Sequence, residues 1–267
     1  MTTKTTTPAP GAPETVDADA PPRETYRDAL RRLGAAQKSA KGGQAYSIYV
    51  NRRLGRATAA AAYMIGLTPN TVTVISACFT YAAIVVVALV SGWPAAAAAP
   101  LLAIGYVLDA ADGQLARLRG GGSLTGEWLD HMADAVKITA LHLAVLIHLY
   151  RFTDLDPAWL LIPMGFNVVA VALFFAQLLN EQLRRNRKIV AAAGGAAPPV
   201  EEGSLAMSLA KLPHDYGVLC WTFALLGAPS LFLGVYGFLF LFNAGYLSLA
   251  LVKWYREMRT LDLQETR

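Results

Sequence analysis

The segment between residues 109 and 134 decides both the architecture and the chemistry expected of this chain, and it reads Asp109-x2-Asp112-Gly113-x2-Ala116-Arg117-x8-Gly126-x3-Asp130-x3-Asp134. Its four carboxylates lie within or at the ends of apolar segments. An isolated charge is costly there, so such acids normally bind cations, form ion pairs or take part in chemistry. Asp109 and Asp112 are spaced i, i+3, and Asp130 and Asp134 are spaced i, i+4, so each pair shares one helix face. Two helices joined by a short glycine-rich turn could direct all four acids into one cavity, which predicts a site for divalent metal ions.

The surrounding sequence is apolar enough for a membrane protein. Hydrophobic residues make up 55% of the 267 residues, and the mean hydropathy is +0.38, above that of typical soluble domains. A helix of about 20 apolar residues crosses the ~30 Å hydrocarbon layer of a bilayer. Six segments approach this length, at 69–91, 94–118, 125–149, 157–180, 214–229 and 231–254. We therefore expect an all-α, polytopic membrane protein with six transmembrane helices.

The positions of the basic residues predict the orientation of these helices. If both termini are cytoplasmic, Arg151 is the one Lys or Arg in an outer loop, and Lys137 is the one deep within a span. This distribution follows the positive-inside rule and predicts a multi-pass protein of the cell membrane with its acidic site facing the cytoplasm. The net charge of +4 then indicates attraction to the anionic inner leaflet. Nucleic-acid binding is not expected, because the basic residues flank spans.

The chain divides into four parts. Residues 1–22 are rich in Thr, Pro and Ala and predict a disordered tail. Residues 23–67 predict amphipathic helices that lie at the membrane surface. Residues 68–254 form the six-helix membrane domain, and 255–267 form a cytoplasmic tail. Cys78 and Cys220 both lie in predicted spans, which favours apolar packing over a disulfide framework.

The residues that accompany the acids favour phosphate chemistry. Gly113 and Ala116 have almost no side chain, so a bulky ligand could approach the backbone closely. Arg117 has a planar guanidinium suited to phosphate, and Gly120 to Ser123 form a flexible loop beside it. Oxygen ligands without Cys or His favour Mg²⁺, Mn²⁺ or Ca²⁺, and two ions could clamp a diphosphate. An Asp at the edge could accept a proton. The pattern predicts transfer of a phosphate-linked group from a nucleotide diphosphate to an alcohol.

The eight positions of the segment match the defining pattern of the CDP-alcohol phosphatidyltransferase family, also called CDP-alcohol phosphotransferases. Pro69-Asn70-x-Val72-Thr73 is also similar to the family's sequence at the start of its first span, so the resemblance covers roughly residues 46–254. It implies six spans, a homodimer in the lipid bilayer and a cavity open to the cytoplasm. It also implies attack of an alcohol on the β-phosphorus of a CDP-linked substrate, with release of CMP.

The resemblance also implies roles for individual residues. Two Mg²⁺ or Mn²⁺ ions would be held by Asp109, Asp112, Asp130 and Asp134, with Asp134 as the general base. Contacts to the nucleotide or substrate are implied at Pro69, Asn70, Thr71, Val72, Gly113, Ala116, Arg117, Ser123 and Gly126. The stretch Ser47 to Arg52 resembles members that use CDP-inositol.

Acceptor-binding residues are expected among Lys137, Arg184, Lys211, His214 and Asp215. Lys137 could equally balance the acids, and Arg184 could be a positive-inside anchor. We expect a role in phospholipid biosynthesis, with CDP-diacylglycerol as donor and inositol phosphate or glycerol phosphate as acceptor. The alternative is a water-soluble CDP-alcohol, such as CDP-inositol, that donates to a lipid or polyol.

A divalent-cation channel or transporter is an alternative function from a different class of protein, because rings of acids select cations in pores. A pore would have no use for Gly113, Ala116 or Arg117. A catalytically inactive scaffold is a third interpretation, and it would typically carry a broken pattern. Every position of the pattern is present here.

Overall fold

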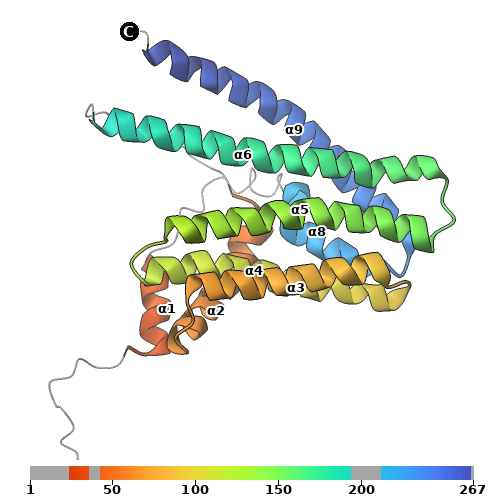
Figure 1. Cartoon of the computed structure of the whole chain (residues 1–267), viewed down its shortest axis with the longest axis horizontal. Coiled ribbons are helices and arrows are strands. Elements are labelled where there is room, and N and C mark those ends of the chain that lie inside the picture. The colour runs from red at the N-terminus through yellow and green to blue at the C-terminus, as the bar shows by residue number, and fades with distance from the viewer. Residues whose placement is uncertain (1–23, 36–42, 194–211, 266–267) are drawn as a thin grey trace, which may run out of the picture.

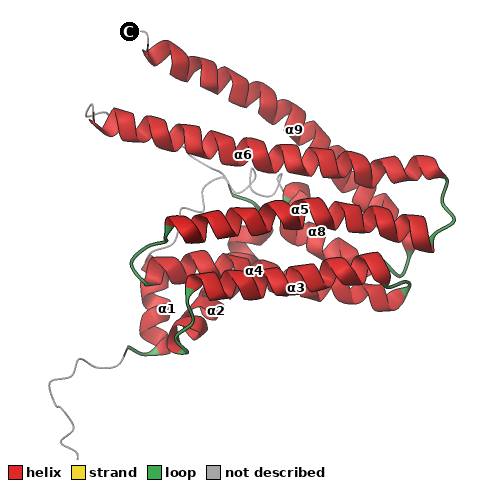
Figure 2. Ribbon diagram, in the orientation of Figure 1, coloured by secondary structure: helices red, strands yellow, loops and turns green. Residues whose placement is uncertain are grey.

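The computed structural model describes residues 24–35, 43–193 and 212–265, although the side chains of 187–193 and 261–265 are not described. All regular structure in these residues is helical (Figure 2), as the apolar periodicity predicts. The predicted tail 1–22 lies outside the described residues.

Five helices are long and apolar enough to cross a membrane. The five candidate spans are Pro69–Leu89, Trp93–Leu118, Leu124–Phe152, Pro157–Asn186 and Pro229–Thr260. They correspond to α3 (Pro69–Leu89), η2 with α4 (Trp93–Ala97 and Ala98–Leu118), α5 (Leu124–Phe152), η3 with α6 (Pro157–Leu160 and Leu161–Ala193), and α9 (Pro229–Glu265). At 1.5 Å per residue, 21 residues reach about 32 Å. Between 17% and 33% of each apolar window is buried, so most of these apolar side chains face outward, as lipid-facing surfaces do.

Side-chain caps fix where several of these helices begin. Thr68 accepts a hydrogen bond from the amide of Thr71 (3.1 Å) at the start of α3, and Pro69 follows at the first helical position. Ser123 accepts from the amide of Gly126 (3.0 Å) at the start of α5. Both are standard N-caps that satisfy amides left free by the helix.

The predicted sixth span, 214–229, is not confirmed. It contains α8 (Tyr216–Thr222) and the short helix η5 (Phe223–Leu225), which together form an apolar helix from Tyr216 to Leu225. Ten residues rise only about 15 Å, half of the hydrocarbon layer. α6 and α9 run in the same direction (Figure 1), and α8 precedes α9 in the chain.

The N-terminal helices pack beside the ends of α3 and α4 (Figure 1). They are α1 (Tyr26–Ala35), a π-helical turn (Ser47–Asn51) and α2 (Arg52–Met64). Val72, Leu33 and Leu115 bury their side chains in a core shared by α1, α2, α3 and α4. Glu24 connects α1 to α2, because it accepts hydrogen bonds from Arg32 on α1 (2.6 and 2.8 Å) and from the hydroxyl of Tyr63 on α2 (2.9 Å).

A larger core joins α3, α4, α5, α6, α8 and α9. Leu102, Leu141, Phe223 and Tyr236 are fully buried in it. His142 on α5 contacts the hydroxyl of Tyr236 on α9 (2.5 Å). This core holds α5 against α9 and thereby supports the acid-bearing part of α5.

Candidate metal and nucleotide site

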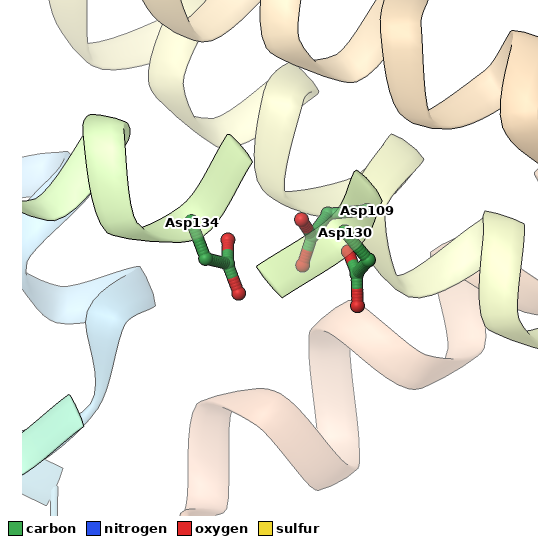
Figure 3. Close-up of side chains that lie close together, drawn as sticks. All are labelled: Asp109, Asp130 and Asp134. Atoms are coloured by element: carbon green, nitrogen blue, oxygen red, sulfur yellow. The ribbon is translucent and has the colours of Figure 1, made fainter. Parts of the chain in front are cut away.

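Three aspartates from two neighbouring helices converge on one point. Asp109 lies on α4, and Asp130 and Asp134 lie one turn apart on α5. One carboxylate oxygen of each lies within 4.8 Å of the corresponding oxygens of the other two. Figure 3 shows Asp109 and Asp130 side by side, with the carboxylate of Asp134 directed toward the same space. The spacing argument therefore predicted this convergence correctly for three of the four acids.

The glycine-rich turn allows the two helices to approach in this way. The amide of Gly121 donates to the carbonyl of Ala116 (2.9 Å), which closes the end of α4. Gly120 and Gly121 have φ of +94° and +137°, a region that favours glycine. The chain then reverses within a few residues, so that α5 begins beside the end of α4.

The donor set fits a hard divalent cation. Two carboxylates 4.8 Å apart repel by roughly 3–4 kcal/mol at an effective dielectric constant of about 20, so the cluster requires positive charge. Lys137, which is 9% exposed, lies 3.3 Å from Asp109 and forms a second ion pair with Asp134. One ammonium does not balance three carboxylates. Oxygen-only ligands match the preference of Mg²⁺ and Mn²⁺.

Asp112 lies outside this three-acid cluster. Its buried carboxylate accepts a hydrogen bond from the hydroxyl of Thr73 on α3 (2.5 Å). It lines the same polar cavity as Asp109 and Asp130. A ligand role for Asp112 in a second metal site therefore remains a prediction.

The polar cavity has a volume of about 260 Å³ and lies between α4, α5 and the N-terminal helices. Gly113, Arg117 and Arg52 line it together with Asp109 and Asp130. The atom nearest to a Cβ placed on Gly113 would be a guanidinium nitrogen of Arg117, at 3.7 Å. The Nε of Arg117 is buried and has no hydrogen-bond acceptor among the described residues. An anionic ligand in this cavity would supply one.

The other predicted nucleotide contacts gather at the same end of the bundle. Asn70 at the start of α3 lies close to Gly126 at the start of α5. A Cβ placed on Gly126 would lie 2.9 Å from the side-chain oxygen of Asn70. Ala116 lies on α4 between the polar cavity and the glycine turn. Ser123 caps α5. Pro69 and Thr71 belong to the first turn of α3, and the side chain of Val72 is buried in the core shared by α1, α2, α3 and α4.

The predicted acceptor contacts separate in space. Lys137 pairs with the acids, and Arg184 on α6 forms an ion pair with Glu257 on α9 (2.6 Å). Asp215 caps α8 by accepting from the amide of Gly217 (3.1 Å) and also accepts from the amide of Ser47 (2.9 Å). His214 and Asp215 both line a second cavity. Lys211 lies outside the described residues.

Sequence reasoning did not place several residues of the polar cavity, although it singled out the stretch Ser47 to Arg52 by resemblance. Tyr106 and Asn51 line it, and the side-chain amide of Asn51 donates to the carbonyl of Tyr106 (3.1 Å). Tyr106 is spaced i, i+3 from Asp109, so its position on the same helix face could have been inferred. Asn51 and Arg52 could not be placed, because only tertiary packing brings the N-terminal helices to α4.

Comparisons with known proteins agree with this geometry. Residues 66–245 match the family model described as CDP-alcohol phosphatidyltransferase. A crystal structure of Mycobacterium tuberculosis phosphatidylinositol phosphate synthase (PgsA1) with manganese and citrate has a TM-score of 0.53 at 18% identity, and the alignment covers 77% of this chain and 89% of that chain.

A second crystal structure of the same synthase, with CDP-DAG bound, has a TM-score of 0.51 at 18% identity and covers 77% and 94% of the two chains. At this identity the likeness shows the fold. A search of curated proteins finds no match. Because the family model spans most of the membrane domain and includes all eight pattern positions, this chain is a member of the CDP-alcohol phosphatidyltransferase family.

Proposed function

We propose that this enzyme transfers a substituted phosphate group from a CDP-alcohol to the hydroxyl of a second alcohol at the Asp109–Asp130–Asp134 cluster, with release of CMP. The observation that carries the proposal is the convergence of these three carboxylates beside a cavity that contains Arg117 and Arg52. A cation channel would need the acids but not a diphosphate-sized cavity with basic residues.

The residues present can be given roles in this reaction. Asp109, Asp130 and Asp134 would hold a divalent cation, with Asp112 available for a second. A bound Mg²⁺ or Mn²⁺ would neutralise the diphosphate and polarise its phosphorus–oxygen bonds. Arg117 would donate hydrogen bonds to the diphosphate. Gly113 and Ala116 would let the nucleotide lie against α4.

Asp134 would accept the proton of the attacking hydroxyl. It is the acid furthest along α5, it lies beside Lys137, and Ile138, one helical turn further along, lines the second cavity. As the oxygen of the acceptor forms its bond to the β-phosphorus, the bond to the CMP oxygen breaks and the hydroxyl proton passes to the carboxylate. Lys137 would then hold Asp134 in place and limit the negative charge of the cluster.

The first candidate donor is CDP-diacylglycerol, with inositol phosphate or glycerol phosphate as acceptor. The similar synthase has been crystallised with CDP-DAG and with manganese, which supports a lipid donor and a divalent ion here. The second candidate is a water-soluble CDP-alcohol that donates to an uncharged lipid or polyol. The composition of the second cavity, described below, favours this second candidate.

We further propose six membrane crossings, with α8 on the fifth, both termini in the cytoplasm and a homodimer. The parallel direction of α6 and α9 supports an additional return of the chain between them.

The experiment that tests the proposal measures CMP release by purified protein in lipid nanodiscs. CDP-diacylglycerol, CDP-inositol and CDP-glycerol are each combined with a panel of acceptors, in Mg²⁺, in Mn²⁺ and in EDTA. We expect metal-dependent CMP release from at least one pair. Metal flux into vesicles without CMP release would instead support a channel.

A further inference from the structure

A second cavity, of about 240 Å³, lies beside the acid cluster between α5, α6, α8 and α9. Ile138 lines it one helical turn beyond Asp134. Tyr216 also lines it, and the centroid of its ring lies 5.4 Å from the Nζ of Lys137. An alcohol that occupied this cavity could therefore present a hydroxyl toward Asp134, on the side away from Arg117.

The walls of this cavity are mainly apolar and come from membrane-spanning helices. Aliphatic and aromatic side chains of α5, α6, α8 and α9 contribute most of them, among them Leu141, Phe166, Leu173, Phe174, Leu219 and Leu239. Such walls favour a ligand that carries hydrocarbon, because a polar ligand would lose its hydration without compensation.

One end of the cavity carries a chain of neutral hydrogen-bonding groups. The amide nitrogen of Asn243 donates to the carbonyls of Leu239 (2.8 Å) and Pro213 (3.2 Å), so its oxygen is left to accept from Nδ1 of His214 (2.5 Å). The Nε2 of His214 lies 3.4 Å from the side-chain nitrogen of Gln177, which donates to it. Nδ1 of His214 is therefore the donor in its contact with Asn243. Tyr246 stacks on the ring, with centroids 4.4 Å apart.

The described residues that line this cavity include no Lys or Arg. Asp215 is the charged group among them, and both of its oxygens already accept backbone amides. A phosphate monoester placed here would face no described cation, and burial of an unpaired charge is strongly unfavourable. A second, neutral polar group of the acceptor, in contrast, could hydrogen-bond to Gln177 while the reacting hydroxyl faces Asp134.

We propose that the acceptor of this enzyme is an uncharged alcohol borne on an apolar body, that it occupies the cavity between α5, α6, α8 and α9, and that Gln177 and His214 determine this specificity. The inference rests on the proposed function and names the substrate class of its second cavity. It selects the second of the two candidate arrangements over a phosphorylated acceptor.

The test compares matched acceptors that differ in a phosphate group. With each CDP-linked donor, CMP release is measured with dioleoylglycerol, with myo-inositol against inositol 1-phosphate, and with glycerol against glycerol 3-phosphate. We expect kcat/KM to be at least about tenfold higher for the uncharged member of each pair, and highest for dioleoylglycerol. Preference for the phosphorylated members would overturn this inference alone. Absence of CMP release from every pair would contradict the proposed function itself.

A charge added to the cavity sharpens the test. Gln177 is exposed at the cavity end, so Gln177→Lys should fold. It should lower kcat/KM for the uncharged acceptor by about tenfold and raise it for the phosphorylated one, because the ammonium places a charge at the end of a mainly apolar cavity and attracts phosphate. Gln182→Lys, on the same helix but outside the cavity lining, is the matched control. The assignment would be contradicted if Gln177→Lys left the ratio of kcat/KM between uncharged and phosphorylated acceptors unchanged. It would also be contradicted if both variants changed this ratio equally.

Discussion

The cavities on the two sides of Asp134 and Lys137 differ in charge. The cavity against α4 is lined by Arg52, Arg117 and three aspartates. The described lining of the cavity against α6 and α9 is mainly hydrocarbon and includes one carboxylate, Asp215, but no Lys or Arg. Charge is thus concentrated where a metal-bound diphosphate is proposed to lie. The difference indicates that the two substrates are distinguished by charge before chemistry occurs.

The largest effect is expected at the boundary between the two cavities. Asp134→Asn keeps the shape of the side chain but removes a metal ligand and the proposed base. CMP release should fall by about 10³-fold or more. Asp156→Asn, at the cap of η3, is the control and should change turnover little. Retained turnover in Asp134→Asn would overturn the base assignment and leave the family membership intact.

Lys137→Met should separate two effects of the Lys137 ammonium, which are stabilisation of the metal-free fold and competition with the metal ion for Asp109 and Asp134. Removal of a buried ion-pair partner costs about 3–5 kcal/mol, so the metal-free variant should have a lower Tm. It should also bind Mn²⁺ about tenfold more tightly, because the ammonium no longer competes for Asp109 and Asp134. Thermal unfolding with and without Mn²⁺ checks both effects.

Lys137→Arg retains the charge and should resemble the native protein. A metal affinity in Lys137→Met equal to or below the native value would show that Lys137 supports the metal site and does not compete with the ion.

Arg117→Lys should weaken the charged cavity selectively. A lysine keeps the charge but loses the planar guanidinium, so the KM for the CDP-linked donor should rise by about tenfold while the KM for the acceptor changes little. Arg119→Lys is the matched control, because Arg119 lies over the ring of Tyr63 outside the cavity lining (5.8 Å). Equal effects of the two substitutions would contradict a specific diphosphate contact.

The smallest effect concerns the N-terminal helices that close the charged cavity. The hydrogen bonds from Arg32 and Tyr63 hold the pKa of Glu24 below its ordinary value of 4.5. A carboxyl whose folded pKa is lowered stabilises the fold above its unfolded pKa, and that stabilisation is lost as the pH falls through the folded pKa. The protection factors of the α1 amides, which are exchange rates corrected for the intrinsic pH dependence, should therefore decrease as the pH falls below about 4.5. In Glu24→Gln, exchange should already be faster at neutral pH, and an unchanged rate there would exclude this role.

The charged cavity was largely predictable from sequence because its residues are close together in the chain. Asp109, Gly113 and Arg117 recur on one face of α4, and the glycine turn returns the chain to Asp130 and Asp134. The hydrogen bond between Asp112 and Thr73 was not predictable. The i, i+3 spacing indicates that Asp112 shares a helix face with Asp109, but it does not indicate which residue of a neighbouring helix lies opposite.

The cavity against α6 and α9 was not predictable as a site. Gln177, His214 and Asn243 lie on three elements far apart in the sequence, and only tertiary packing joins them. His214 and Asp215 were expected to contact the acceptor together. Both line this cavity, and Asp215 also accepts hydrogen bonds from two backbone amides. The span expected at 214–229 illustrates the same limit, because composition alone does not reveal where an apolar helix stops.

Manganese binding tests the central claim most directly. Free Mn²⁺ can be titrated by electron paramagnetic resonance against the purified native protein and Asp130→Asn, without any substrate. If Asp109, Asp130 and Asp134 form the metal site, the native protein binds Mn²⁺ and the variant binds it at least about tenfold more weakly. Equal affinity in the two proteins would contradict the account.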